Sequence, residues 1–111
     1  MPIEYADFDK VDMRAGLVVA VEEFPRARKP SYKVQVDFGP ELGVRWSSAQ
    51  AKRDYRVDDL VGRQLVAVVN LHPKNIAGFS SEALLLGVPA EGGGLSLLVP
   101  SRPAQPGGRV Y

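Results

Sequence analysis

The residues of this chain that are best suited to chemistry are basic side chains gathered in its middle third. Residues 24 to 56 carry eight Lys and Arg residues against three acidic ones, whereas residues 1 to 23 carry two basic and six acidic residues. Lys and Arg bind nucleic acid by displacing the counterions condensed on its phosphates. A solvated charged face is the alternative interpretation. Seven of these cations are candidate nucleic-acid-binding residues: Arg26, Arg28, Lys29, Lys33, Arg45, Lys52 and Arg53.

The chain lacks the groups that most enzymes use to move protons or to hold metals. It has no cysteine and a single histidine, His72, so a thiolate or multi-histidine metal site cannot form. No Gly-x-Ser-x-Gly motif surrounds any serine, and the glycines at 92 to 94 are not followed by the Lys-Ser/Thr pair of a phosphate-binding loop. We therefore expect a binding protein and not an enzyme, with no catalytic residue, no metal and no cofactor.

Length and composition indicate one ordinary domain. The chain has 111 residues, is 45% hydrophobic and 24% charged, and has a formal net charge of +1. A chain of this length can bury a single core. The absence of cysteine fits a reducing compartment, so the cytoplasm is the expected location. Residues 1 to 7 lack the basic stretch and apolar run of a signal peptide, and no segment is apolar enough for membrane insertion.

Short strands separated by frequent turns have to position the basic residues. Residues 32 to 38 alternate apolar and polar side chains, which predicts a strand with one buried face and an inward-pointing Phe38. Residues 15 to 21 and 65 to 71 are rich in valine and read as strands buried on both faces. Three further short strands are expected, at Val44 with Trp46, at residues 83 to 88, and at Leu95 with Leu97 and Val99.

Helical turns and a tail complete the predicted architecture. Residues 48 to 62 fit a short helix with Val57 and Leu60 facing inward and Gly62 as its end, and residues 5 to 11 fit a weaker turn. The Pro- and Gly-rich tail has to pack against another element. Five or so strands with one helical connection predict an all-β, five-stranded Greek-key OB-fold barrel in a single domain of residues 1 to 111, with a β-sandwich as the alternative.

A set of motifs along the chain occurs in the order that is typical of one family. They include Phe24-Pro25-x-Ala27-Arg28, Tyr32-Lys33-Val34, Ser47-Ser48-Ala49-Gln50, Val68-Val69-Asn70-Leu71-x-Pro73, Ile76-x-Gly78-Phe79-x-Ser81-Glu82 and Leu84-Leu85-Leu86-Gly87. Through them, residues 7 to 110 resemble the EMAP-II-like tRNA-binding domain family. The resemblance implies an OB-fold homodimer in which residues 1 to 12 and 100 to 111 form the subunit contact.

Two functions follow from this resemblance. The tRNA-binding members hold the tRNA body with basic residues and with polar groups that correspond here to Asn70, Lys74, Ser81 and Glu82. An export-chaperone branch of the family binds unfolded preproteins or peptides and the SecA translocation ATPase. The resemblance thus implies either RNA or an unfolded polypeptide as the partner.

The chain departs from the tRNA binders at two places, and both departures follow the chaperone branch. Ala83 and Leu84 stand where tRNA binders usually have Gly and Met, and residues 28 to 32 replace a segment of the Asp-Lys-Leu type. We therefore expect an export-related chaperone, with structure-specific tRNA binding as the alternative.

A chaperone of this kind needs an exposed apolar groove for peptides. Tyr32, Trp46 and Phe79 are the candidate peptide-binding residues. Packing of these rings in the core is the alternative interpretation, because aromatic side chains in small barrels are usually buried.

Overall fold

A long strand, β1 (Met13–Glu23), organises the fold by pairing with a different strand along each half. The computed structural model describes all 111 residues. From Leu17 onward β1 pairs antiparallel with β2 (Tyr32–Asp37), and its first residues up to Leu17 pair with β4 (Gln64–Val68). The register shifts between Val18 and Ala20, and such irregularities bend and twist a strand. One strand therefore contributes to two walls of the barrel.

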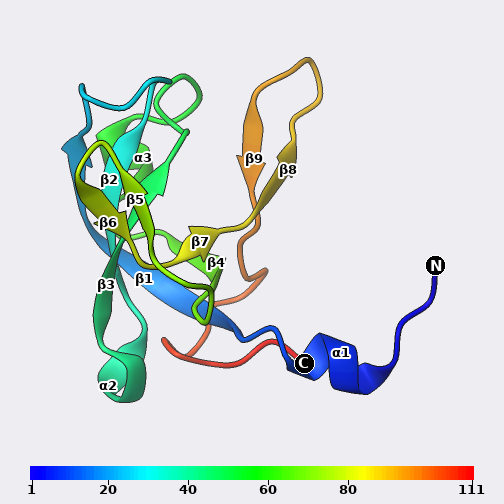
Figure 1. Cartoon of the computed structure of the whole chain (residues 1–111). Coiled ribbons are helices and arrows are strands. Elements are labelled where there is room, and N and C mark those ends of the chain that lie inside the picture. The colour runs from blue at the N-terminus through cyan, green and yellow to red at the C-terminus, as the bar shows by residue number, and fades with distance from the viewer.

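The sheet contains five antiparallel strands in the order β3-β2-β1-β4-β7, with β3 at Val44–Ala49 and β7 at Leu84–Leu85. Figure 1 shows the sheet curling into a nearly closed barrel. Residues just before β7 close it against β3. The Glu82 amide donates to the Trp46 carbonyl at 2.8 Å, and the Ser47 hydroxyl donates to the Ala83 carbonyl at 2.7 Å. The predicted all-β barrel is confirmed, and the sandwich alternative is wrong.

The barrel interior is filled by the inward side chains of β2 and their neighbours. Tyr32, Val34, Val36 and Phe38 are buried, as the alternation of polar and apolar residues predicts. Gly16 on β1 permits close packing here, because a Cβ atom at this position would lie 2.5 Å from Val36 Cγ1 and 2.7 Å from Phe38 Cε1. Other members of the core come from later elements: Leu60, Leu65, Ala67, Val69 and Leu97.

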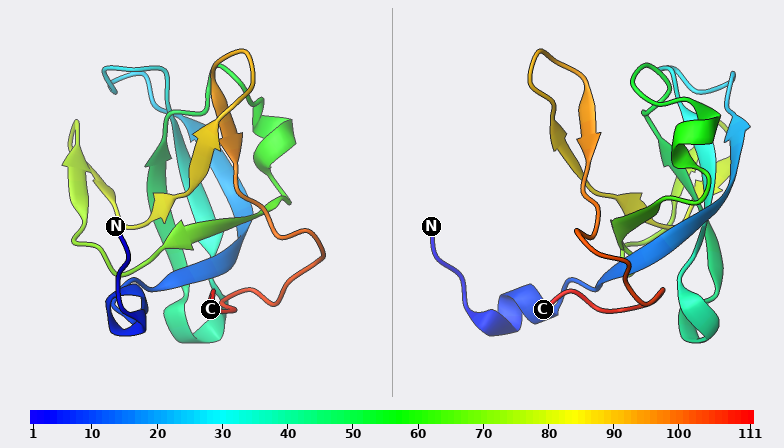
Figure 2. Two further views of the ribbon diagram at one scale, coloured as in Figure 1. Left: turned by 90° about the vertical axis from the view of Figure 1, so that its right-hand side faces the viewer. Right: turned by 180° about the vertical axis from the view of Figure 1, so that it is seen from behind.

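The three helices, α1 (Tyr5–Asp9), α2 (Gly39–Leu42) and α3 (Val57–Leu60), are short. Helix α3 lies in the segment predicted to be helical, buries Leu60, and is followed by Gly62 with φ of 87°. Helix α1 lies at the predicted N-terminal turn but buries no residue, and Figure 2 shows that it projects away from the barrel. None of the helices has the length and apolar character needed to span a membrane.

The C-terminal tail packs along the first half of β1. The Gly107 amide donates to the Ala15 carbonyl at 2.8 Å, and the Ala15 amide donates to the Gly108 carbonyl at 2.9 Å. The Val110 amide donates to the Met13 carbonyl at 2.8 Å. The expectation that the tail packs against another element is confirmed, and the element is the same chain's central strand.

Two hairpins project from the barrel (Figure 1). One consists of β5 (Lys74–Ile76) and β6 (Phe79–Ser81), and the other consists of β8 (Gly87–Pro89) and β9 (Leu95–Leu97). The glycines at 92 to 94 form the connection of the second hairpin. The edge of β9 is held by side chains, because the Leu95 amide donates to the Asp54 carboxylate and the Leu97 amide donates to the Tyr55 hydroxyl, each at 3.0 Å.

Three strand predictions need correction. Residues 15 to 21 are not buried on both faces: Val19 is 41% exposed, because no element covers the outer side of the sheet there. The strand expected at 65 to 71 ends at Val68, since the chain then leaves the sheet and exposes Leu71. The strand expected at 83 to 88 is divided into β7 and β8, which pair with different partners, β4 and β9.

Candidate functional site

Three adjoining hollows form one surface groove beside the C-terminal end of β3. They have volumes of about 700, 430 and 280 Å³, and Ser48 and Gln50 line all three. Their walls come from the loop of residues 24 to 31, the end of β3, the β5–β6 hairpin, β7 and the β8–β9 hairpin. We call this surface the composite groove. Its parts are the apolar hollow of about 700 Å³, the basic hollow of about 430 Å³ and the hairpin hollow of about 280 Å³.

Four of the predicted nucleic-acid-binding residues come together in the basic hollow. Arg26, Arg28 and Lys29 reach it from the loop between β1 and β2, and Lys74 reaches it from β5. The lining contains no carboxylate, and polar side chains of Ser31, Ser48, Gln50 and Asn75 complete it. Like charges held around one hollow reinforce each other's attraction for an anion, so this part of the groove suits phosphates or carboxylates.

The apolar hollow has a leucine wall and a basic rim. Leu84 and Leu85 come from β7, and Leu95 and Leu97 come from β9. The rim carries Lys29, which also lines the basic hollow, and Arg53. The hollow also contains Asp54, whose carboxylate is engaged by the Leu95 amide. These leucines were not predicted as site residues, because a leucine in a groove wall and a leucine in a core strand give the same sequence pattern.

The three predicted peptide-binding rings do not share one surface. Tyr32 is 5% exposed, and its hydroxyl donates to the Tyr55 carbonyl at 2.9 Å. Because β2 alternates, Tyr32 points into the barrel with Val34, so its assignment to an exposed groove is wrong. Trp46 and Phe79 lie on the outer face, in an edge-to-face contact with ring centroids 6.2 Å apart.

The Lys33 ammonium group lies over the rings of Phe79 and Phe24, and Lys33 does not line the composite groove. Its Nζ atom lies 5.0 Å from the centre of the Phe79 ring and 5.1 Å from that of Phe24. A cation at this distance from a ring face is attracted by the ring quadrupole. The half-buried Trp46 and Phe79 and the buried Phe24 therefore form an aromatic cluster that already holds a cation of its own.

Ser81 and Glu82 close the barrel in addition to lining the hairpin hollow. The Ser81 hydroxyl accepts a hydrogen bond from the Ser48 amide at 3.0 Å, and the Glu82 carboxylate accepts one from the Trp46 amide at 3.1 Å. The Glu82 side chain is thereby hydrogen-bonded to the backbone of β3. His72 and Lys74 are the other titratable side chains of this hollow.

Three other predicted residues lie outside the composite groove. Lys52 forms an ion pair with Glu23, and the hydrogen bond to that carboxylate raises the pKa of Lys52. Arg45 donates to the Val69 carbonyl at 2.6 Å. Asn70 accepts from the Asp12 amide at 2.9 Å and donates to the Lys10 carbonyl at 2.7 Å. These contacts hold the polypeptide together and were not apparent from the sequence, because they join residues far apart along the chain.

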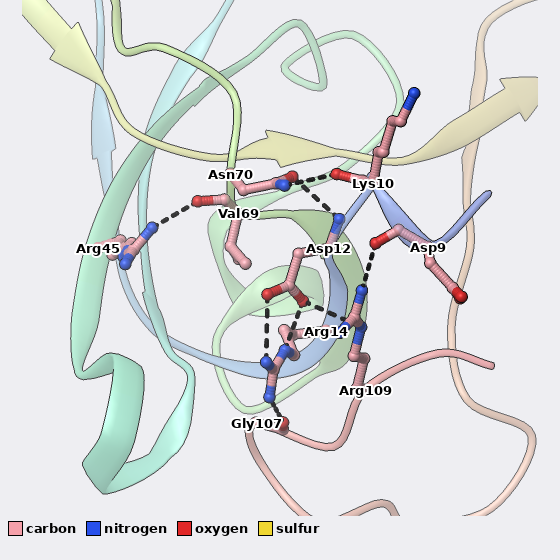
Figure 3. Close-up of polar contacts among 9 residues, drawn as sticks. All are labelled: Asp9, Lys10, Asp12, Arg14, Arg45, Val69, Asn70, Gly107 and Arg109. Carbon is pink, nitrogen blue, oxygen red and sulfur yellow. Dashed lines mark hydrogen bonds and ion pairs between the residues drawn. The ribbon is translucent and has the colours of Figure 1, made fainter. Parts of the chain in front are cut away.

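Asn70 belongs to a polar cluster at the base of helix α1, which Figure 3 shows with its neighbours. Arg14 donates to the two carboxylate oxygens of Asp12 at 2.5 and 3.1 Å, and to the Gly107 carbonyl at 3.0 Å. Arg109 lies 3.7 Å from the same carboxylate and donates to the Asp9 carbonyl at 2.8 Å. The cluster thus joins α1, β1 and the tail.

The structure contains no cluster of potential metal ligands. No group of three or more His, Asp or Glu side chains is placed to hold a metal ion. What the geometry offers is a groove with basic and apolar regions, which can hold a larger molecule by contact.

Comparison of the sequence with known proteins identifies one family. Residues 13–109 match the family model described as "Putative tRNA binding domain". The methionine–tRNA ligase of Thermococcus onnurineus is 38% identical over 108 residues, which are 97% of this chain and 14% of that enzyme. That of Pyrococcus abyssi is 36% identical over 110 residues, which are 99% of this chain and 15% of that enzyme. The chain therefore spans a small part of these curated relatives.

Comparison with solved structures gives full-length matches. The CsaA chaperone protein of Picrophilus torridus has a TM-score of 0.92 and 41% identity, covering 99% of this chain and 100% of that one. The chaperone CsaA of Bacillus anthracis has a TM-score of 0.91 and 43% identity, with 100% of both chains covered. A MetRS related protein of Pyrococcus horikoshii has a TM-score of 0.87 and 29% identity, covering 100% and 99%. The resemblance found in the sequence is confirmed.

The polar cluster leads to a prediction about stability. The hydrogen bond from Arg14, with further attraction from the cluster's other guanidinium groups, lowers the pKa of Asp12 below its ordinary value of 3.8. The stabilisation is therefore complete above the unfolded-state pKa and is lost as the pH falls through the lower folded-state pKa. We expect Asp12→Asn to lower the free energy of unfolding by about 1 kcal/mol at pH 7, with the difference vanishing in acid.

Urea unfolding of both proteins over a series of pH values measures this difference. Asp58→Asn is the matched control, because Asp58 is exposed on α3 and forms no ion pair. A penalty for Asp12→Asn that is the same at every pH would contradict the assignment to an ionised carboxylate.

Proposed function

The chain belongs to the tRNA-binding domain family, and from this premise we propose that it is a CsaA-type, non-catalytic chaperone of the cytoplasm. In this proposal the composite groove holds extended segments of unfolded preproteins or peptides. The observation that carries the proposal is the apolar hollow of about 700 Å³, whose leucine wall consists of the exposed Leu84, the half-buried Leu85 and Leu95, and the edge of the core residue Leu97. Contiguous exposed apolar surface on a small protein is typical of a binding site for other polypeptides.

In this proposal the peptide-binding role is assigned to the composite groove and not to the aromatic residues Tyr32, Trp46 and Phe79. Leu84 lies in the wall of the groove, where it is 50% exposed and lines both the apolar and the hairpin hollow. Its solvent-accessible area can therefore decrease further when a polypeptide binds. Trp46 contacts Phe79, and Phe79 contacts Lys33, outside the groove, and in the proposal the two rings support the fold of the neighbouring wall. Leu84 is also one of the positions at which the sequence follows the chaperone branch.

Substitution of Leu84 tests the chaperone proposal. Leu84→Ser should weaken the binding of a labelled unfolded preprotein by about fivefold. The reason is that half of the Leu84 surface is exposed in the free protein and would be buried by the bound polypeptide. Fluorescence anisotropy measures the affinity, with the same preprotein in its folded form as the negative control.

Val44→Ser is the matched control variant, since Val44 is equally exposed but lies on β3 outside the three hollows. The proposal is abandoned if the unfolded chain binds no more tightly than the folded one.

Adding SecA to the complex extends the test to the partner that the family resemblance implies, and transfer of the preprotein to SecA is the expected result.

Structure-specific tRNA binding is the second candidate function. The observation that favours it is the basic hollow, where four cations surround about 430 Å³ and no carboxylate intervenes. Arg53 extends the positive charge along the rim of the apolar hollow. A groove of this kind contacts the phosphate backbone, so it would read the shape of a folded RNA and not its sequence.

The salt dependence of tRNA binding tests this second candidate. Each phosphate contact contributes about 0.7 to 0.9 to the slope of log affinity against log salt concentration, so Arg28→Gln should reduce the slope by nearly one unit. Arg102→Gln, in a hollow that shares no residue with the composite groove, should leave the slope unchanged. A flat salt dependence of the unaltered protein rules out this candidate.

The proposal includes a homodimer held by residues 1 to 12 and 100 to 111. Met1, Ile3 and Tyr5 are largely exposed in a segment that projects from the barrel, and Tyr111 is fully exposed in the tail nearby (Figure 2). A second copy would cover this apolar surface, and the polar cluster around Asp12 would hold the segment and the tail in place.

Sedimentation velocity measures the oligomeric state. The unaltered protein should sediment as a dimer at micromolar concentration, whereas Tyr5→Asp should shift it toward the monomer, because a charge would be buried in the contact. The thermal unfolding of a dilute sample should be unaffected, since Tyr5 makes no buried contact within its own chain. A monomeric unaltered protein would contradict the proposed contact.

A further inference from the structure

We propose that the composite groove selects apolar polypeptide segments flanked by acidic residues and discriminates against those flanked by basic ones. The inference rests on the proposed chaperone function and specifies its substrate class. Three features of the groove support it: an excess of basic side chains, the lack of ion-pair partners for them, and a lining without Phe, Tyr or Trp.

The groove has more positive than negative charge. Its three hollows are lined by five basic side chains and two carboxylates. The basic residues are Arg26, Arg28, Lys29, Arg53 and Lys74. Five cations on one continuous surface produce a positive field that attracts acidic partners and repels basic ones.

The two carboxylates of the groove are engaged within the protein, whereas the cations are free. Asp54 accepts a hydrogen bond from the Leu95 amide, and Glu82 accepts one from the Trp46 amide. None of the five basic side chains forms an ion pair or a side-chain hydrogen bond with another residue. An incoming acidic group therefore meets unpaired cations, whereas an incoming lysine meets only two carboxylates, each of which already accepts a backbone hydrogen bond and is outnumbered by cations.

Lys29 connects the two regions that such a segment would occupy. It lines both the basic hollow and the apolar hollow. An extended chain that places an apolar side chain against Leu84 and Leu95 would carry its neighbouring residues past Lys29 and toward Arg28. The geometry therefore favours acidic residues next to the apolar ones and not at a distance from them.

The lining of the groove favours polypeptide over unpaired nucleotides as the occupant. No Phe, Tyr or Trp lines any of the three hollows, although Trp46 and Phe79 are close by on the outer face. Proteins that bind single-stranded nucleic acid usually stack the bases on aromatic rings. A wall of leucines instead complements aliphatic side chains, which bind without directional contacts.

Three labelled peptides with the same leucine-rich centre test the inference, with flanks of Glu, Gln or Lys. Anisotropy titrations at low and at moderate salt should show the Glu peptide binding about tenfold more tightly than the Lys peptide, with the Gln peptide between them. The difference should shrink as the salt concentration rises, because these charges are exposed to solvent.

The double variant Arg28→Glu/Lys29→Glu should remove or reverse the order of the three affinities. Both residues are exposed in a loop, and circular dichroism verifies that the fold is retained. Arg102→Glu, outside the composite groove, is the control for a change in net charge alone and should preserve the order.

The possible results separate this inference from the function on which it rests. Equal affinities for the three peptides, or tightest binding of the Lys peptide, overturn the charge preference and leave the chaperone proposal standing. Absence of binding by all three overturns both, and a parallel titration that shows tRNA binding would then support the second candidate function.

Discussion

The backbone groups of Trp46 and Ser48 on the outer edge of β3 have to find hydrogen-bond partners, and Ser81 and Glu82 provide them. This contact closes the barrel. It also fixes the β5–β6 hairpin, which precedes it, and β7, which follows it. Both of these elements wall the composite groove, so the groove exists where it does because the sheet edge is satisfied there.

The groove combines positive charge and apolar surface in one place. Its basic hollow suits the phosphates of RNA or the carboxylates of a peptide, and its apolar hollow suits aliphatic side chains. Lys29 lines both, so the two regions adjoin and a ligand that spans them would contact both. The comparisons reflect the same duality, since the family model refers to tRNA and two of the structural matches are chaperones.

Local pattern was sufficient to predict β2 and the clustering of Arg26, Arg28 and Lys29, which are close in the sequence. The β5–β6 hairpin that brings Lys74 to them was not predicted, because strands of three mixed residues show no alternation. Tyr32 was assigned to a peptide-binding groove although the alternation of residues 32 to 38 already places it on the inward face with Val34. Arg45 and Asn70 are engaged through tertiary contacts that no short-range pattern reveals.

The pairing of the tail with β1 brings the two ends of the domain to the same corner, where Arg109 lies 3.7 Å from Asp12. A module built in this way can be joined to other domains without a linker crossing its binding surface. This architecture suits a unit that matches a small part of long ligases and also the whole of much shorter proteins. Portability of this kind follows from the pairing of the C-terminal tail with the first residues of the central strand.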